Sequence, residues 1–380
     1  MNRRDFLKCV GCGTAATGVV QSPFWPQVLG GVQNAWAFDV ADKLSAVEAR
    51  HYRKLEGGGI ECGICPRHCR VTDLERGFCG TRENRGDVYY TLVYNLPCSL
   101  NIDPIEKKPF FHFFPGTTAL SLATAGCNVD CKFCQNWEIS QARPEQTTNY
   151  EFTAQDAVET CRARNVPTIA YTYSEPVIFY EYMFDMAEFG HKHGIKSVMI
   201  TGGYIDEQPL RELIPQLDAI KVDLKAIRES YYRDVVRGEL KPVLDRLIQM
   251  REAGIWLEIV NLVVPTLNDT DDEFTKLARW VKTFLGVDVP VHFSRFHPQY
   301  LLTELPITPQ KTLERAYQIC RAEGLEYVYL GNLPAHKAES TYCPGCGAMV
   351  IERRGYSTRV VGLAGGKCSS CRHDIPGRFA

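Results

Sequence analysis

Short apolar runs rich in β-branched residues alternate with longer amphipathic stretches over most of this chain, beginning at Ala119. Length and composition predict buried strands at 119–125, 168–172, 196–200, 218–222, 256–263, 291–296 and 326–330. Helical periodicity predicts helices at 153–164, 176–193, 206–214, 240–253, 270–285 and 309–323. Such alternation builds a parallel sheet with crossover helices. The sequence therefore predicts an α/β fold, a complete or partial (β/α) barrel of the TIM type.

Polar and small residues follow the predicted strands. The carboxyl ends of barrel strands form one rim, where active sites of such barrels are built. Taken singly, each of these residues is more typical of a cap, a turn or a surface pair, but their joint placement on one rim predicts a ligand site. Both signs of charge and two glycines, which let the backbone approach a ligand, suit a zwitterionic ligand. The candidates are Glu175, Thr201, Gly202, Gly203, Asp223, Lys225, Asn261 and His297.

Three cysteines, Cys127, Cys131 and Cys134, form a Cys-x3-Cys-x2-Cys loop directly after the first of these strands. A cubane [4Fe–4S] cluster normally takes four thiolates, so three leave one iron open to a substrate or cofactor. The other interpretations are reduced thiols or a zinc knuckle, and the knuckle needs a fourth ligand from elsewhere in the chain. The spacing favours the iron–sulfur cluster.

Eleven of the sixteen cysteines fall into three groups, which indicates metal ligation more than a disulfide framework. Cys62, Cys65, Cys69 and Cys79 form the first group, and thiolates at this spacing accept either zinc or a second iron–sulfur cluster. The last group is Cys343, Cys346, Cys368 and Cys371, two Cys-x2-Cys knuckles about twenty residues apart, which is a zinc-ribbon pattern. A unit this small needs a metal to stay folded, so we expect structural zinc there.

The N-terminus matches a twin-arginine (Tat) export signal. Arg3-Arg4 precedes Phe6-Leu7-Lys8, a mildly apolar stretch follows, and Ala35-Trp36-Ala37 offers a small-x-small cleavage site. We expect an exported, periplasmic protein whose mature chain begins at Phe38. The alternatives are an uncleaved leader that tethers the protein to the membrane, and a cytoplasmic protein. The sequence contains no run of eighteen apolar residues, so it predicts no transmembrane span.

Four segments are predicted along the chain: the leader at 1–37, a Cys-rich region at 38–116, the barrel at 117–335 and the zinc-ribbon-like segment at 336–380. Within the Cys-rich region, 41–55 has the pattern of a short helix and 87–95 that of a strand. The formal net charge of −2 gives no reason to expect a nucleic-acid partner.

Several phrases of the sequence carry a family resemblance. They are the cluster loop, Cys62-Gly-Ile-Cys65-Pro, Gly77-Phe-Cys-Gly80, Asp103-Pro-Ile-Glu-Lys-Lys-Pro109, Ala125-Gly-Cys-Asn128, Cys134-Gln-Asn-Trp137 and Tyr171-Thr-Tyr-Ser-Glu-Pro176. Together they resemble the pyruvate formate-lyase activating-enzyme-like branch of the radical S-adenosylmethionine (SAM) superfamily. More narrowly, they resemble the radical SAM enzyme of the AmmeMemoRadiSam system. The resemblance covers nearly all of the chain after the leader.

The resemblance implies that Cys127, Cys131 and Cys134 hold a [4Fe–4S] cluster whose open iron chelates SAM. One electron then cleaves SAM to a 5′-deoxyadenosyl radical that abstracts hydrogen. Glu175 would meet the SAM amino group, although the double glycine that usually precedes this glutamate is missing here. Asp223 and Lys225 match an Asp-Leu-Lys element near SAM, and His297 matches a Phe-His element on the sixth strand.

Three functions are therefore open. The first is a radical SAM oxidoreductase, reduced by a flavodoxin or ferredoxin, that takes hydrogen from a glycyl position of a protein partner or from a small molecule. The second is an exported iron–sulfur electron-transfer protein without SAM chemistry, which explains the leader better but leaves the polar rim unexplained. The third is a zinc-dependent interaction protein, which would contain zinc without iron.

Overall fold

The computed structural model describes residues 39–333 and 336–379. The predicted export signal at 1–37 lies outside the described residues, as do Cys9 and Cys12, and it remains a prediction. The described residues form one compact unit. Within the described part of the chain, none of the helices is both long and apolar enough to cross a membrane.

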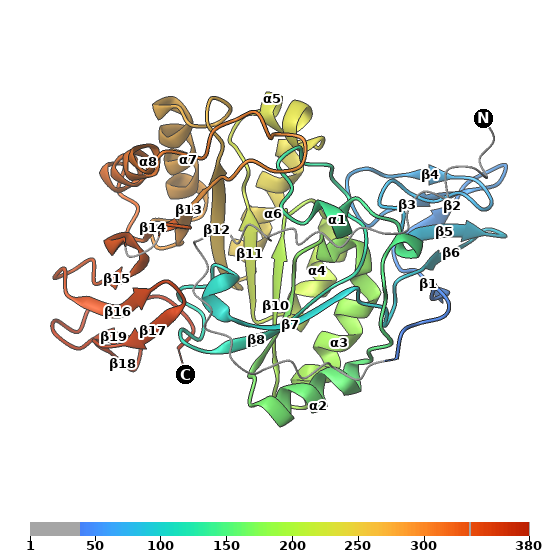
Figure 1. The fold of residues 1–380 in the computed structure, drawn as a ribbon, viewed down its shortest axis with the longest axis horizontal. Coiled ribbons are helices and arrows are strands. Elements are labelled where there is room, and N and C mark those ends of the chain that lie inside the picture. The colour runs from blue at the N-terminus through green and yellow to red at the C-terminus, as the bar shows by residue number, and fades with distance from the viewer. Residues whose placement is uncertain (1–38, 334–335, 380) are drawn as a thin grey trace, which may run out of the picture. The chain divides into compact units, whose positions relative to one another are not determined.

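An eight-stranded sheet forms the centre of this unit, with the order β14-β13-β12-β11-β10-β9-β8-β7 (Figure 1). All neighbours pair in parallel except β7, which runs antiparallel to β8. The sheet confirms the predicted α/β fold as a partial barrel, and each of the seven predicted strands is present with ends shifted by at most two residues. The strands are β7 (Ser99–Pro104), β8 (Thr118–Ala123), β9 (Thr168–Tyr171), β10 (Lys196–Thr201), β11 (Ala219–Asp223), β12 (Trp256–Val263), β13 (Val291–Arg295) and β14 (Val328–Gly331).

Helices cover the sheet between successive strands. The main ones are α2 (Ala154–Arg164), α3 (Tyr180–Lys192), α4 (Glu207–Leu213), α6 (Leu240–Glu252), α7 (Asp271–Phe284) and α8 (Gln310–Ala322). Thr153 and Thr270 cap α2 and α7, each accepting a backbone N–H three residues on. Phe274, Leu277, Ala278 and Val281 form the buried stripe of α7. All six predicted helices are confirmed, although Pro176–Phe179 forms a 3-10 turn before α3.

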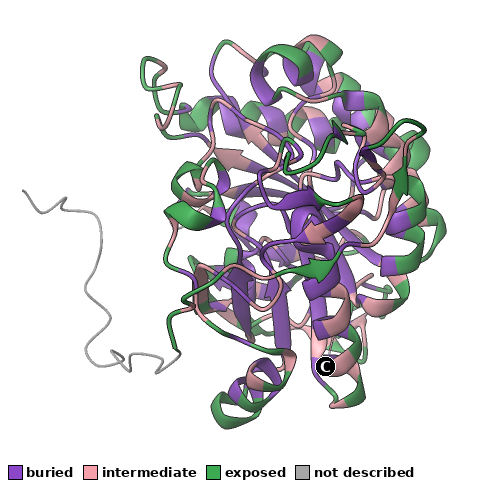
Figure 2. Cartoon of the chain, turned by 90° about the vertical axis from the view of Figure 1, so that its right-hand side faces the viewer, coloured by how far each residue is buried: buried purple, intermediate pink, exposed green. Residues whose placement is uncertain are grey.

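The sheet and the helices that cover it differ in burial: the strands are buried, and the outer faces of the helices are exposed (Figure 2). All four residues of β9 and seven of the eight in β12 are buried. Parallel strands covered on both faces read as continuous apolar runs, which is why the sequence pattern located them.

The Cys-rich region forms two three-stranded antiparallel sheets, β1-β6-β5 and β2-β3-β4. The predicted strand at 87–95 is confirmed as β6, but the predicted helix at 41–55 is wrong, since β1 and β2 lie there and pair with β6 and β3. A short isolated helix is marginal in water, and cross-strand pairing outweighs it. The strands are β1 (Val47–Glu48), β2 (Tyr52–Lys54), β3 (Ile60–Cys62), β4 (Arg70–Val71), β5 (Arg82–Arg85) and β6 (Val88–Thr91).

The C-terminal segment is a second small β unit. It contains β15 (Thr341–Tyr342), β16 (Met349–Arg354), β17 (Ser357–Val360), β18 (Leu363–Ala364) and β19 (Lys367–Cys368). Arg353 is buried and its guanidinium donates to the Phe111 carbonyl at 2.5 Å and to the Thr341 hydroxyl at 2.8 Å. This arginine joins the C-terminal segment to the loop that enters the barrel.

Candidate active site

The loop with the three central cysteines leaves β8 and is held in place by backbone hydrogen bonds. Asp130 and Lys132 donate their N–H groups to Val236 and Val235 at 3.2 and 3.0 Å. These two acceptors belong to a π-helical turn, η6 (Tyr232–Val236), which follows the short helix α5 (Glu229–Tyr231). π-Turns are rare and often occur at functional sites.

The three thiols suit an iron–sulfur cluster. Cys131 is buried and Cys127 and Cys134 are partly buried, and all three line one cleft. Burial raises the pKa of Cys131 to about 12, against the opposing charge of Lys225. Such thiols bind as thiolates only when a metal supplies positive charge. A three-thiolate donor set of this kind fits a cubane cluster with one open iron.

Glu175 forms the centre of a hydrogen-bonded group at the ends of β9 and β10. Its carboxylate accepts the Thr201 hydroxyl at 2.5 Å and the Gly202 N–H at 2.8 Å. The Gly203 N–H in turn donates to the Thr201 hydroxyl oxygen at 2.9 Å. A side chain at Gly202 would begin 3.3 Å from a Glu175 oxygen, so glycine leaves room beside the carboxylate. The structure thus brings together four residues that the sequence predicted for one site.

A second charged group lies at the end of β11. Asp223 pairs with Lys221 and, at 3.5 Å, with Lys225. Although burial favours the neutral acid, the two lysines hold the pKa of Asp223 below its usual range. The Lys225 ammonium also lies 5.5 Å from the ring centre of Phe133, next to Cys134.

These groups share a cleft of about 480 Å³. The predicted residues on its wall are the three cysteines of the loop, Glu175, Thr201, Gly202, Asp223 and Lys225. The other lining residues were not selected from the sequence, and five of them are charged residues or tyrosines: Lys107, Lys108, Tyr173, Lys221 and Tyr356. Three of the five stand in motifs already quoted for the family resemblance, which was the signal available for them.

Lys108 and Tyr173 belong to a buried polar cluster with Asp103. The Lys108 ammonium lies 2.6 Å from an Asp103 oxygen and 4.1 Å from the Tyr173 ring centre. Burial lowers the pKa of Lys108 to about 8, although Asp103 opposes this shift. A cleft residue with a pKa this close to neutrality is suited to proton transfer as well as to charge binding.

Three predicted residues lie outside the residues that line this cleft. Asn261 is buried and donates its side-chain amide to the Leu224 carbonyl at 2.8 Å, which holds the turn after β11. Gly203 packs against Val222, where a Cβ would lie 3.0 Å from a methyl carbon. His297 is exposed beyond the end of β13. Their predicted contacts with SAM remain predictions.

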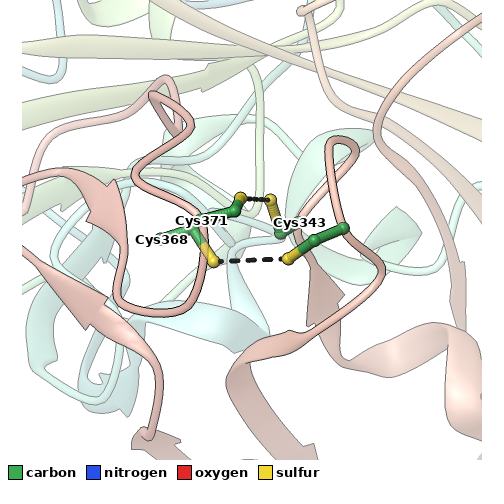
Figure 3. A group of neighbouring side chains, drawn as sticks. Cys343, Cys368 and Cys371 are labelled. Atoms are coloured by element: carbon green, nitrogen blue, oxygen red, sulfur yellow. Dashed lines mark hydrogen bonds between the residues drawn. The ribbon is translucent and has the colours of Figure 1, made fainter.

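The C-terminal cysteines form a compact group of four sulfur atoms. The Cys343 and Cys371 sulfurs are 3.5 Å apart, and the Cys346 and Cys368 sulfurs are 3.7 Å apart (Figure 3). All four lie within 4.8 Å of one another. Tetrahedral zinc with Zn–S bonds of 2.3 Å places its ligands about 3.8 Å apart. This group therefore could hold one metal ion.

The first cysteine group begins at the last residue of β3 and ends just before β5. Cys62 and Cys65 are buried, and Cys69 and Cys79 are partly exposed. Cys62 donates its N–H to the Cys69 carbonyl at 2.9 Å, which closes the loop between β3 and β4. The sequence therefore places these four residues on one short, folded segment.

The parallel partial barrel, the three-cysteine loop and the charged cleft are together typical of a cofactor-dependent enzyme. Comparisons with known proteins agree with this class. Residues 121–281 match the sequence pattern of the Radical SAM superfamily. The uncharacterized protein MJ0808 of Methanocaldococcus jannaschii is 46% identical over 316 residues, which cover 83% of this chain and 94% of that protein. Pyruvate formate-lyase-activating enzyme of Clostridium pasteurianum is 22% identical over 172 residues, covering 43% of this chain and 69% of that enzyme.

Among solved structures, a radical SAM methyltransferase from Sphaerobacter thermophilus is similar at 20% identity and a TM-score of 0.44. The aligned region covers 62% of this chain and 71% of that one. The chain belongs to the radical SAM superfamily. Membership implies a [4Fe–4S] cluster and SAM as cofactors.

Proposed function

We propose that the protein cleaves SAM reductively and uses the resulting 5′-deoxyadenosyl radical to abstract hydrogen from a substrate, as an oxidoreductase. One observation carries the proposal: the three loop cysteines and the charged residues Glu175, Asp223 and Lys225 line the same cleft. When bound, the cluster and SAM supply the one-electron chemistry, and the protein supplies binding and orientation.

The residues of the cleft have separate tasks in this proposal. Cys127, Cys131 and Cys134 would hold the cluster as its thiolate ligands. Glu175, already oriented by Thr201 and Gly202, accepts hydrogen bonds from the SAM amino group. Lys225 and Asp223 present opposite charges beside it, at the end of β11.

For the substrate, we propose a glycyl position of a partner protein or a C–H bond of a small molecule that enters the cleft. The relation to pyruvate formate-lyase-activating enzymes supports the protein substrate. The reductant in this proposal is a flavodoxin or ferredoxin.

Anaerobic incubation of the reconstituted protein with SAM and dithionite tests this function. We expect 5′-deoxyadenosine and methionine to form in equal amounts. Protein with a verified cluster that forms neither product would favour the electron-transfer function instead.

Replacing Glu175 by glutamine should raise the Kd for SAM by about 10- to 100-fold, the worth of a hydrogen bond to a buried charge. The change keeps the size of the side chain but places an amide where an ammonium must bind. Anaerobic calorimetry measures the Kd, and iron content should not change because Glu175 is not a ligand. Glu239→Gln is the matched control, since Glu239 is exposed, lies outside the residues that line the cleft and accepts a hydrogen bond from the Tyr204 hydroxyl at 3.2 Å. Equal SAM affinity in the two variants would remove Glu175 from the site.

For the C-terminal cysteines we propose structural zinc, supported by the spacing of the four sulfur atoms. Purified protein should contain about one zinc ion per chain at this site. Cys346→Ser/Cys371→Ser should lose that zinc and expose the segment from residue 336 onward to limited proteolysis. Cys98→Ser, which changes an isolated cysteine, should retain both zinc and protease resistance. Zinc content that is equal in both variants would contradict the assignment.

We also propose that the leader directs export to the periplasm, on the strength of Arg3-Arg4 and the residues that follow. N-terminal sequencing of the native protein should begin at Phe38. An intact Met1 in the membrane fraction would indicate a tether instead, and an intact Met1 in the cytosol would indicate a cytoplasmic protein.

A further inference from the structure

We propose that Cys62, Cys65, Cys69 and Cys79 hold a second iron–sulfur cluster, which passes electrons to the cluster at Cys127, Cys131 and Cys134. The metal assignment stands independently of SAM chemistry, whereas the electron-transfer role rests on the proposed function.

The four thiols are neighbours, and two of them receive hydrogen bonds from their own segment. Cys65 lies within electrostatic range of the other three. The Phe78 N–H donates to the Cys69 sulfur at 3.4 Å, and the Thr81 hydroxyl donates to the Cys79 sulfur at 3.3 Å. Hydrogen bonds to the ligand sulfurs are one means by which proteins set the potential of an iron–sulfur cluster.

Two buried polar groups beside these thiols lack a partner within the described residues: the Arg82 Nε and the Tyr89 hydroxyl. Both lie within electrostatic range of Cys62 and Cys79. A Cβ at Gly77 would lie 2.8 Å from the Tyr89 oxygen and 3.6 Å from the Cys69 sulfur. Buried donors without acceptors are rare and call for a bound group. The inorganic sulfides of a cluster are acceptors that a zinc ion does not have.

The spacing of the sulfur atoms separates this group from the C-terminal one. Cys343, Cys346, Cys368 and Cys371 have their sulfurs within 4.8 Å of one another, and no other three cysteines in 39–333 and 336–379 do so. The four thiols of the first group are therefore more widely spread, as are the three of the catalytic loop. Ligands of a cubane bind separate irons, so their sulfurs stand farther apart than those around one ion.

The first group packs directly on the loop of the catalytic cluster. Gly126, the neighbour of Cys127, has a φ of +97°, and a Cβ there would lie 2.6 Å from the Cys79 carbonyl oxygen. Arg67 donates to the Asn128 carbonyl of the same loop. One backbone contact thus separates the ligands of the two groups. Electron tunnelling falls steeply with distance, and this contact provides a short path.

The same group also reaches the surface. Cys69 and Cys79 are partly exposed, and Phe78 between them is 51% exposed. A protein donor of the flavodoxin or ferredoxin class can therefore approach this side. The donor loses one electron, the second cluster gains it and passes it on, and the catalytic cluster is reduced by one electron. No proton or atom is transferred.

The metal assignment is tested in the triple variant Cys127→Ala/Cys131→Ala/Cys134→Ala, purified anaerobically. About four iron and four sulfide per chain should remain, with a reduced-cluster EPR signal that SAM does not change. Zinc at this group in place of iron would overturn the proposal. This result does not depend on SAM cleavage, so it separates failure here from failure of the proposed function.

The electron-transfer role is tested with Cys62→Ser/Cys65→Ser. With reduced flavodoxin as the donor, formation of 5′-deoxyadenosine should fall at least ~10-fold, while the dithionite-driven rate stays within about twofold. Equal loss with both reductants, or no loss with either, would overturn the role. Cys98→Ser is the control. If circular dichroism shows that the double variant is unfolded, Cys69→Ser replaces it with the same expected and contradicting results.

Discussion

Replacing Cys131 by alanine should lower the formation of 5′-deoxyadenosine by more than about 100-fold, because loss of a hydrogen-bonding partner around a metal ligand already costs 10- to 100-fold. Cys131 is the buried member of the three loop cysteines, at 6% exposure, so no water-exposed group can replace its sulfur easily. Product is measured by chromatography after anaerobic reaction with SAM and dithionite.

The control for this variant is Cys161→Ala, which removes a thiol that is also buried but lies in α2, outside the cysteine groups. It should retain most of the activity and all of the iron. Activity above one-tenth of the unmodified protein in Cys131→Ala would show that Cys131 is not a required cluster ligand, where one-tenth corresponds to about 1.4 kcal/mol.

Replacing Glu258 by leucine should destabilise the protein by about 3–5 kcal/mol, because each buried donor left without an acceptor costs about 1–3 kcal/mol. Glu258 is fully buried in β12 and accepts His292 Nε2 at 2.8 Å. It also accepts the N–H groups of Phe111 and His112 at 3.0 and 2.9 Å, and that of the Trp256 indole at 3.1 Å. All of these donors would lose their acceptor. The melting temperature of the anaerobic protein should fall by roughly 5–10 °C.

The pair of Arg279 and Glu323 at the protein surface, where Arg279 is exposed and Glu323 half-buried, offers a control. Glu323→Leu should change the melting temperature by no more than about 1 °C, since exposed ion pairs contribute little. Because Glu258 lies outside the lining of the cleft, SAM affinity should be preserved in any Glu258→Leu protein that folds. A melting temperature equal to that of the control would show that this network does not stabilise the barrel.

The strands and helices of the barrel were predictable because each strand is buried on both faces and each helix on one. β7 was missed for the opposite reason. It is a partly exposed edge strand that contains Asp103 and Pro104, so it has no apolar run. The helix predicted at 41–55 failed because two-residue and three-residue strands there are formed by pairing with distant segments.

Part of the candidate site was also accessible from sequence. The cysteine spacing and the positions after the strands identified eight of the residues that line the cleft. Lys221 and Tyr356 carried no signal, because one is a charged residue inside a strand and the other lies in the C-terminal segment, far from the barrel in sequence. His292, a polar residue on the sixth barrel strand, faces Glu258 instead of the cleft.

By itself, the sequence determined the alternating barrel elements and the three cysteine groups, since both depend on the order and spacing of residues along the chain. Only the tertiary structure decided which residues meet. Some of these contacts join segments that are distant in sequence, namely the bonds from Thr201 and Gly202 to Glu175 and the contact of Cys79 with Gly126. The salt bridge from Lys108 to Asp103 is local, but no local pattern predicts that these two residues pair. Such contacts depend on how the sheet curves and how its connecting loops pack, which no local pattern of residues specifies.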